Sequence, residues 1–138
     1  MKNTSDLLQE LNNTSNIEAY LKENEDILVN QALCTYLTEF VASKSLSKAD
    51  IIRKSDINEI YGYQIFSGKR FPSRNKLIRL CIGAKFTIEE INNVMTMGEF
   101  SPLYPKIMRD SILIFGIKNG YSIMKINELL YSHELDTI

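Results

Sequence analysis

Residues 46–80 read LSKADIIRKSDINEIYGYQIFSGKRFPSRNKLIRL, and this stretch decides the fold that the sequence predicts. Ser47 can cap one short helix and Asn58 can cap a second, because both are preferred at helix N-termini. Ser67-Gly68 ends the second helix, since glycine tolerates the left-handed geometry of helix C-termini. Pro72-Ser73 then opens a third helix. The stretch therefore predicts two short helices joined by a tight turn, then a loop and a further helix.

The rest of the chain also carries helical periodicity, without the alternation that is typical of strands. Outside the central stretch, helices are expected from Ser5 to Leu11, from Ser15 through Leu21, from about Ile27 to Ser43, from Thr87 through Met95, from about Lys106 to Lys118 and from Ser122 to about His133. The fold class is accordingly all-α. Within the first helix of the central stretch, Ala49 and Ile52 are expected to face inward, and Ile51 could do so as well.

Three regions are expected along the chain. Residues 1–26 form an acidic N-terminal helical segment, residues 27–98 a central helical domain, and residues 99–138 a C-terminal helical hairpin. A stiff connector, residues 101–105 with two prolines, leads into the hairpin. The hairpin is expected either to pack on the rest of the chain or to form a dimer contact, because its apolar face needs a partner.

The charge is unevenly distributed. The 138 residues hold 16 basic and 17 acidic side chains, and the net charge of -1 argues against a protein that coats nucleic acid or an anionic membrane with its whole surface. Residues 1–46 carry three basic and seven acidic side chains (-4), residues 47–80 eight and three (+5), and residues 81–138 five and seven (-2). The positive charge therefore coincides with the central stretch.

The same stretch resembles the XRE, or λ-repressor-like, family of bacterial and phage DNA-binding domains. The matching residues are Leu46-Ser47, Ile57-Asn58 and Ser67-Gly68-Lys69-Arg70 with Pro72, in a register without gaps. The likeness covers roughly residues 30 to 97, and the wider pattern looks like small XRE-type proteins from Gram-positive anaerobes. The sequence departs from the family where Lys48 replaces a glutamine, Asp56 the glycine of the turn, and Gly62 a branched apolar residue.

The resemblance implies a λ-repressor-like helix-turn-helix bundle, here with extra N-terminal helices and the C-terminal hairpin. It also implies a sequence-specific transcriptional regulator that binds double-stranded DNA as a homodimer, with the helix at about 58–66 in the major groove. On the family register, the residues that would read bases are Asn58, Glu59, Ile60, Tyr63 and Gln64. Those that would contact phosphates are Ser47, Lys48, Lys69, Arg70, Ser73 and Arg74.

Chemistry suggests what three of the base-reading side chains could recognise. Gln64 could pair with adenine through two hydrogen bonds, Glu59 could accept one from a cytosine amino group, and Ile60 could touch a thymine methyl.

An alternative function remains open, because two of these residues fit DNA binding poorly. Glu59 is unfavourable near phosphates, and a glycine inside a helix costs about 1 kcal/mol relative to alanine, although Gly62 could let Tyr61 or Phe66 pack close. The alternative is a non-enzymatic adaptor that binds another protein through the acidic N-terminal helices or the C-terminal hairpin. Five tyrosines could mark a partner surface or lie in the core: Tyr61, Tyr63, Tyr104, Tyr121 and Tyr131.

No pattern of an enzyme, a metal site or a cofactor site is found in the sequence, so none of the three is expected. His133 is the single histidine and is expected at the surface, whereas Cys34 and Cys81 are expected as buried small apolar residues. A start without a signal-peptide pattern, and apolar runs too short for a bilayer, lead us to expect a cytoplasmic protein.

Overall fold

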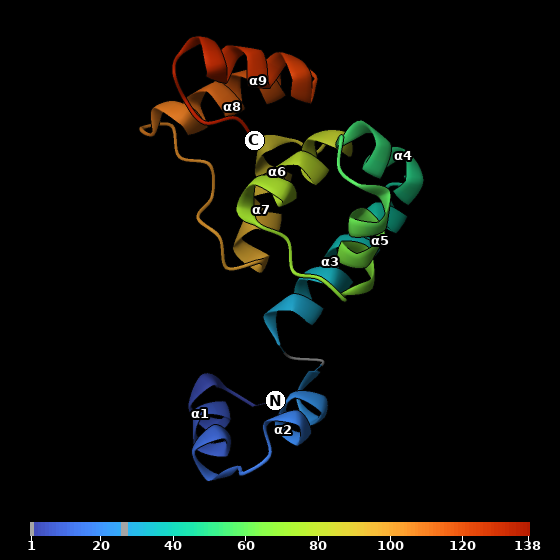
Figure 1. The fold of residues 1–138 in the computed structure, drawn as a ribbon, viewed down its shortest axis with the longest axis vertical. Helices are drawn as coiled ribbons and strands as arrows, with labels where there is room; N and C mark the ends of the chain where they lie inside the picture. The colour runs from blue at the N-terminus through green and yellow to red at the C-terminus, as the bar shows by residue number, and fades with distance from the viewer. Residues whose placement is uncertain (1, 26–27) are drawn as a thin grey trace.

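The computed structural model describes residues 2–25 and 28–138, and every regular element within these ranges is an α-helix (Figure 1). In chain order the helices are α1 (Thr4–Asn13), α2 (Ile17–Glu23), α3 (Val29–Ser43), α4 (Lys48–Lys54), α5 (Glu59–Ser67), α6 (Arg74–Gly83), α7 (Ile88–Met97), α8 (Met108–Lys118) and α9 (Ile123–Ser132). The all-α prediction is confirmed for this part of the chain. None of these helices has both the length and the apolar character needed to cross a membrane.

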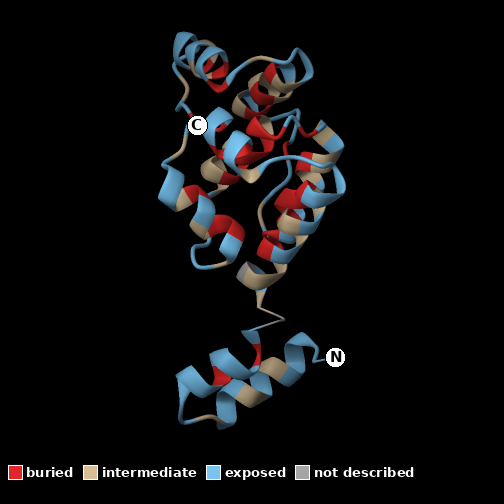
Figure 2. Cartoon of the chain, turned by 90° about the vertical axis from the view of Figure 1, so that its right-hand side faces the viewer, coloured by how far each residue is buried: buried red, intermediate tan, exposed pale blue. Residues whose placement is uncertain are grey.

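Helices α1 and α2 form a small pair that polar side chains tie together. The amide of Asn24, buried at the end of α2, donates to Glu10 Oε1 at 3.0 Å, and Lys2 forms an ion pair with the same carboxylate at 2.8 Å. Hydrogen bonds from Lys2 and Asn24 lower the pKa of Glu10. Figures 1 and 2 show this pair apart from the other helices.

Helices α3 to α7 pack around one apolar core. Leu33, Leu37 and Val41 recur every four residues along α3, so they share the face that meets α5 and α7. Figure 2 shows the buried residues concentrated on the inner sides of these helices. The other central core residues are Ile51, Ile52, Ile65, Phe66, Leu77, Ile78, Leu80, Cys81, Ala84, Phe86, Ile91, Val94 and Met95.

Two glycines let α4 lie close to its neighbours. A Cβ atom on Gly62 would stand 2.7 Å from Cγ1 of Ile52, and one on Gly83 would stand 2.7 Å from the carbonyl oxygen of Ile51. Gly62 therefore makes room for Ile52 of α4. Closer packing of Tyr61 or Phe66 at this glycine stays a prediction. The expectation that Ala49 faces inward is wrong: Ala49 is exposed, because it borders an open hollow between α4 and α5.

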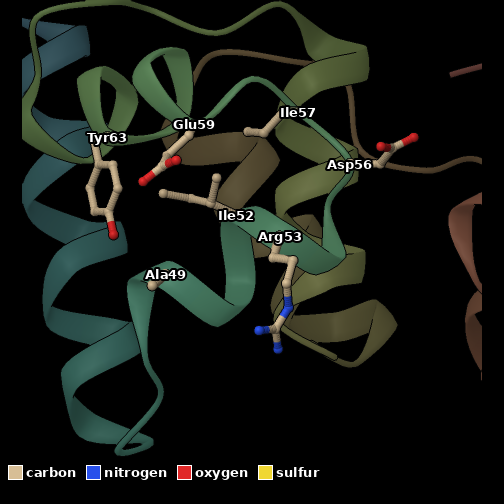
Figure 3. A pocket seen from close by; sticks show the side chains of 7 residues that line it. All are labelled: Ala49, Ile52, Arg53, Asp56, Ile57, Glu59 and Tyr63. Carbon is tan, nitrogen blue, oxygen red and sulfur yellow. The ribbon is translucent and has the colours of Figure 1, made fainter.

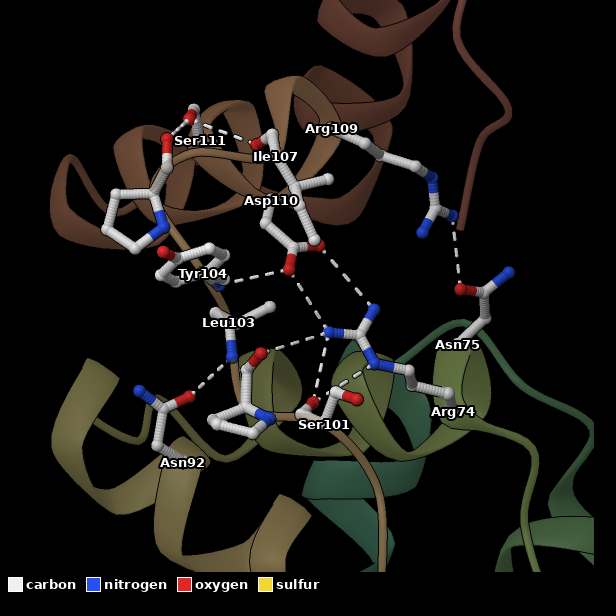
Figure 4. Close-up of polar contacts among 12 residues, drawn as sticks. Arg74, Asn75, Asn92, Ser101, Leu103, Tyr104, Ile107, Arg109, Asp110 and Ser111 are labelled. Carbon is white, nitrogen blue, oxygen red and sulfur yellow. Dashed lines mark hydrogen bonds and ion pairs between the residues drawn. The ribbon is translucent and has the colours of Figure 1, made fainter.

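The C-terminal hairpin, α8 and α9, packs onto the central helices and extends their core through Leu113, Ile126 and Leu130. A polar network reinforces this contact (Figure 4). The buried carboxylate of Asp110 accepts from Arg74 Nη2 of α6 at 3.2 Å and from the Tyr104 backbone at 3.0 Å. The hairpin is thus held on α6, as its apolar face required, and a role in dimerisation stays a prediction.

Most helix starts lie where the sequence placed them. Ser47, Asn58, Ser73, Thr87 and Ser122 each accept a hydrogen bond from a backbone N–H of the first helical turn that follows. The two N-terminal helices differ, because Asn3 and Asn16 cap them in place of Ser5 and Ser15. The expected start of the third helix near Ile27 lies outside the described residues, as does the boundary between 26 and 27.

Candidate nucleic-acid interface

The turn between α4 and α5, residues 55–58, is held by α6. Asp56 has a φ of 53°, a left-handed conformation that aspartate tolerates better than most residues. Arg79 of α6 donates from Nε to the Ser55 carbonyl at 3.1 Å and from Nη2 to the Asp56 carbonyl at 2.7 Å. The guanidinium also pairs with the Asp56 carboxylate at 3.3 Å. These contacts fix the direction in which α5 leaves the turn.

One side of α5 is accessible and carries the residues predicted to read bases. Gly62, Ile65 and Phe66 are buried against the core, whereas Asn58, Glu59, Ile60 and Tyr63 are exposed and Gln64 is half-buried. The Ile60 side chain is 69% exposed, which is unusual for an isoleucine in a helix that contributes to a core. The five predicted residues are therefore brought together along the outer side of one helix.

A hollow on one flank of α5 is lined by two cations and no carboxylate. It lies between α5, the loop after it and the start of α6. Its walls are Asn58, Ile60, Tyr61, Gln64, Arg70 and Lys76. Arg70 Nε donates to Gln64 Oε1 at 3.0 Å, and the Arg70 guanidinium lies 5.6 Å from the centre of the Tyr61 ring. We call this surface the basic hollow. It offers hydrogen-bond donors and positive charge beside an apolar side chain.

The opposite flank of α5 has the reverse balance of charge. A second hollow, drawn in Figure 3, lies between α4 and α5 and is lined by Ala49, Ile52, Arg53, Asp56, Ile57, Glu59 and Tyr63. Arg53 forms its ion pair with Asp50 at 3.1 Å, and Glu59 pairs with no cation among the described residues. An anionic ligand is therefore favoured on the basic hollow over this one.

The predicted phosphate-contact residues surround α5 but differ in their availability. Ser47 and Ser73 are the exposed caps of α4 and α6, and Lys69 and Arg70 are exposed in the loop after α5. Lys48 is half-buried, with its ammonium 5.5 Å from the centre of the Phe66 ring.

Arg74 has a different environment from the other five. Besides its ion pair with Asp110, its Nη2 donates to the Ser101 carbonyl at 3.1 Å. Figure 4 shows the guanidinium enclosed by these partners. Its hydrogen-bonding capacity is therefore largely used inside the protein, and we leave Arg74 out of the functional set.

Two residues that matter to this surface were not selected from sequence. Lys76 lines the basic hollow. It lies within the +5 stretch, three residues after the cap Ser73, and this position could have identified it as a candidate anion-binding residue. Arg79 fixes the turn, but its role depends on the packing of α6 against residues 55 and 56, which no local pattern encodes.

The two cysteines and the single histidine lie outside the basic hollow. Cys34 and Cys81 are both buried, as expected, and burial raises the pKa of the Cys81 thiol. His133 is exposed at the end of α9. Within residues 2–25 and 28–138, no three histidine, cysteine or acidic side chains are grouped so as to hold a metal ion.

The fold and the surface together define an all-α protein in which a pair of short helices presents a basic hollow beside an exposed helix face. No protein-family model, curated protein or solved structure matches the chain.

Proposed function

We propose that the chain is a sequence-specific DNA-binding regulator of transcription, in which α3 to α7 act as a λ-repressor-like helix-turn-helix domain of the XRE type. Helices α4 and α5 would be the helix pair, and α5 would enter the major groove, which is wide enough to admit one helix. Such a regulator would act in the cytoplasm on double-stranded DNA.

The observation that carries this proposal is the basic hollow beside the accessible side of α5. The hollow combines an apolar side chain, an amide and two cations, which come from Ile60, Gln64, Arg70 and Lys76. Base edges in the major groove present acceptors, donors and thymine methyl groups, flanked by phosphates. This combination of side chains suits that surface, and the absence of a carboxylate among the walls of the hollow avoids repulsion of the phosphates.

The residues around α5 would divide into two roles. Asn58, Glu59, Ile60, Tyr63 and Gln64 would face bases, with Glu59 near a cytosine amino group, which can donate a hydrogen bond to a carboxylate in the major groove. The phosphate contacts would come from Ser47, Lys48, Lys69, Arg70 and Ser73, together with Lys76.

The test is a salt titration of binding to fragments of the source genome, with a variant and a charge-matched control. Lys69→Glu/Arg70→Glu reverses two charges beside α5. Lys106→Glu/Lys118→Glu reverses two exposed charges, one in the turn before α8 and one at its last residue. We expect sub-micromolar binding by the unaltered chain. Losing two phosphate contacts should reduce the slope of log affinity against log salt by about 1.8.

The control pair should leave the slope nearly unchanged. Absence of binding to every fragment at low salt would refute the proposal, as would equal losses in the two variants. Circular dichroism of both variants checks that they remain folded.

A second candidate, an adaptor that binds another protein or a second copy of this chain, is favoured by the outer surface of α9. Met124 and Tyr131, two helical turns apart, are 73% and 80% exposed, and Phe115 of α8 is exposed as well. Met124→Ser/Tyr131→Ser should leave DNA affinity per monomer intact. If it instead abolishes function in cells while the Lys69→Glu/Arg70→Glu variant retains it, the adaptor is the better description.

A homodimer would reconcile the two candidates, because two domains could then contact half-sites about 34 Å apart. Sedimentation of the unaltered chain and of the α9 variant tests this proposal.

A further inference from the structure

The side chains of Gln64 and Arg70 form one unit on the surface of α5. Arg70 Nε donates to Gln64 Oε1 at 3.0 Å, and the backbone N–H of Arg70 donates to the Gln64 carbonyl at 3.2 Å. The Arg70 guanidinium also lies over the Tyr61 ring, 5.6 Å from its centre. Arg70 is therefore positioned before any ligand arrives, and it orients the Gln64 amide.

This orientation decides what the Gln64 amide offers to a ligand. An amide carries an acceptor oxygen and a donor NH2 group, and the Arg70 N–H already uses one lone pair of the oxygen. The second lone pair lies next to a positive guanidinium, so another donor approaching it meets a positive charge. The NH2 group has no such restriction. The unit therefore acts mainly as a donor of hydrogen bonds.

We propose that the Gln64–Arg70 unit selects guanine over adenine at the base pair that it faces, with Arg70 as the residue that positions Gln64. The inference rests on the proposed DNA-binding function. Guanine presents two acceptors in the major groove, N7 and O6, whereas adenine presents N7 and a donating amino group. Two acceptors match a donor unit, and the adenine amino group does not. This proposal differs from the pairing of Gln64 with adenine that the sequence allows, and the selection of bound duplexes distinguishes the two.

Lys76 strengthens the same preference. It lines the basic hollow together with Gln64 and Arg70, and no carboxylate is among the residues that form this hollow. Its ammonium adds donors and positive charge, and no acceptor, beside Gln64, and this favours a base edge with two acceptors, such as that of guanine.

The first experiment selects bound duplexes from a random pool with the unaltered chain, Gln64→Ala, Arg70→Lys and Lys69→Ala. The position read by Gln64 is the one whose base preference disappears in Gln64→Ala. At that position the unaltered chain should prefer guanine. Arg70→Lys keeps the charge but loses the Nε–H that holds the amide, so the preference for guanine over adenine should fall by about tenfold.

The control variant, Lys69→Ala, removes a neighbouring exposed cation whose backbone N–H, and not its ammonium, donates to Gln64. It should weaken binding to all sequences similarly and leave the guanine preference unchanged. Adenine preferred by the unaltered chain, or an unchanged preference in Arg70→Lys, would overturn the inference while leaving DNA binding intact. Failure to enrich any sequence would overturn the proposed function itself.

A measurement without DNA tests the unit separately. In nuclear magnetic resonance spectra of the free protein, the Arg70 Nε–H should exchange with solvent more slowly than that of Arg53, whose side chain is 72% exposed. Gln64→Ala should remove this protection. Equal exchange of the two arginines in the unaltered chain would overturn the inference independently of any DNA result.

Discussion

Gly62 is the residue at which the packing of α4 against α5 can be tested most directly. Alanine would gain about 1 kcal/mol over glycine from helix propensity alone. Its Cβ, however, would stand 2.7 Å from Ile52 Cγ1 and 2.8 Å from Cγ2, and overpacking of this kind costs about 1–3 kcal/mol. We expect Gly62→Ala to lower the free energy of unfolding by about 1 kcal/mol, measured by urea denaturation.

A second background supplies the control. Ile52→Ala alone should destabilise by about 2–5 kcal/mol because it leaves a cavity, but it removes the atoms that crowd residue 62. Adding Gly62→Ala to Ile52→Ala should therefore be neutral or stabilising. An effect of the same sign and size in both backgrounds would contradict the role assigned to Gly62.

Some residue-level features of this surface could be predicted from the sequence, and others could not. The left-handed conformation of Asp56 could be predicted, because the resemblance puts Asp56 at the glycine of the turn and aspartate tolerates that geometry better than most residues. The residues on the exposed side of α5 were implied by the family register of the resemblance. The bond between Gln64 and Arg70 could not be predicted, because it depends on two long side chains adopting compatible rotamers across a loop.

Between helices, Lys44 and Glu90 link the end of α3 to the start of α7 through an ion pair of 2.7 Å. Burial raises the pKa of Glu90, but hydrogen bonds from Lys44 and Thr87, with the charge of Lys44, outweigh it and hold that pKa below its ordinary 4.5. A carboxyl with a lowered pKa in the folded state stabilises the fold fully above the pKa of the unfolded chain. This contribution is lost as the pH falls below 4.5 through the folded pKa.

Glu90→Gln should therefore reduce stability by about 0.5–1 kcal/mol at pH 7, and by progressively less as the pH falls below 4.5. Glutamine can still accept from the Thr87 N–H, so the helix cap is retained and only the charge is removed. Glu89→Gln, an exposed neighbour in the same turn, is the control. Urea denaturation between pH 3 and 7 gives the free energy of unfolding of the unaltered chain and of the two variants. If Glu90→Gln lowers this free energy equally at every pH, the ion pair does not stabilise the fold.

Helix boundaries were predictable where a side chain caps the helix and less so elsewhere. Thr87 and Glu90 form a capping box at the predicted start of α7, and this pattern is readable from sequence because both of its halves lie within four residues. The start of α8 was placed near Lys106 but lies at Met108, after Ile107, whose side chain makes no capping hydrogen bond. Sequence does not distinguish Asn3 from Ser5 as the cap of α1, because both residue types cap equally well and the choice depends on the reciprocal contact of Asn3 with Asp6.

Across the whole molecule, the positive charge of residues 47–80 is divided by the fold rather than displayed together. Arg74 and Arg79 turn inward to fasten the hairpin and the α4–α5 turn, while Arg70 and Lys76 line the basic hollow. The charge count along the sequence located the region correctly. It could not separate structural arginines from accessible cations, because their partners, Asp110 and the backbone at residues 55 and 56, come from other elements.

This use of Arg74 predicts that the hairpin and the central helices unfold as one unit. Asp110→Ala would leave the Arg74 guanidinium and the Tyr104 N–H without their buried acceptor, at a cost of about 2–3 kcal/mol. One continuous core joins α8 and α9 to α6 and α7. The substitution should therefore lower the exchange protection of the slowest-exchanging amides of α3 to α7 as well as that of the hairpin amides. Hydrogen exchange resolved by residue measures it, with Lys118→Ala, an exposed change on α8, as the control. If amide protection falls in α8 and α9 alone, the hairpin unfolds independently of the central helices. The Arg74–Asp110 pair would then stabilise only the hairpin against local unfolding.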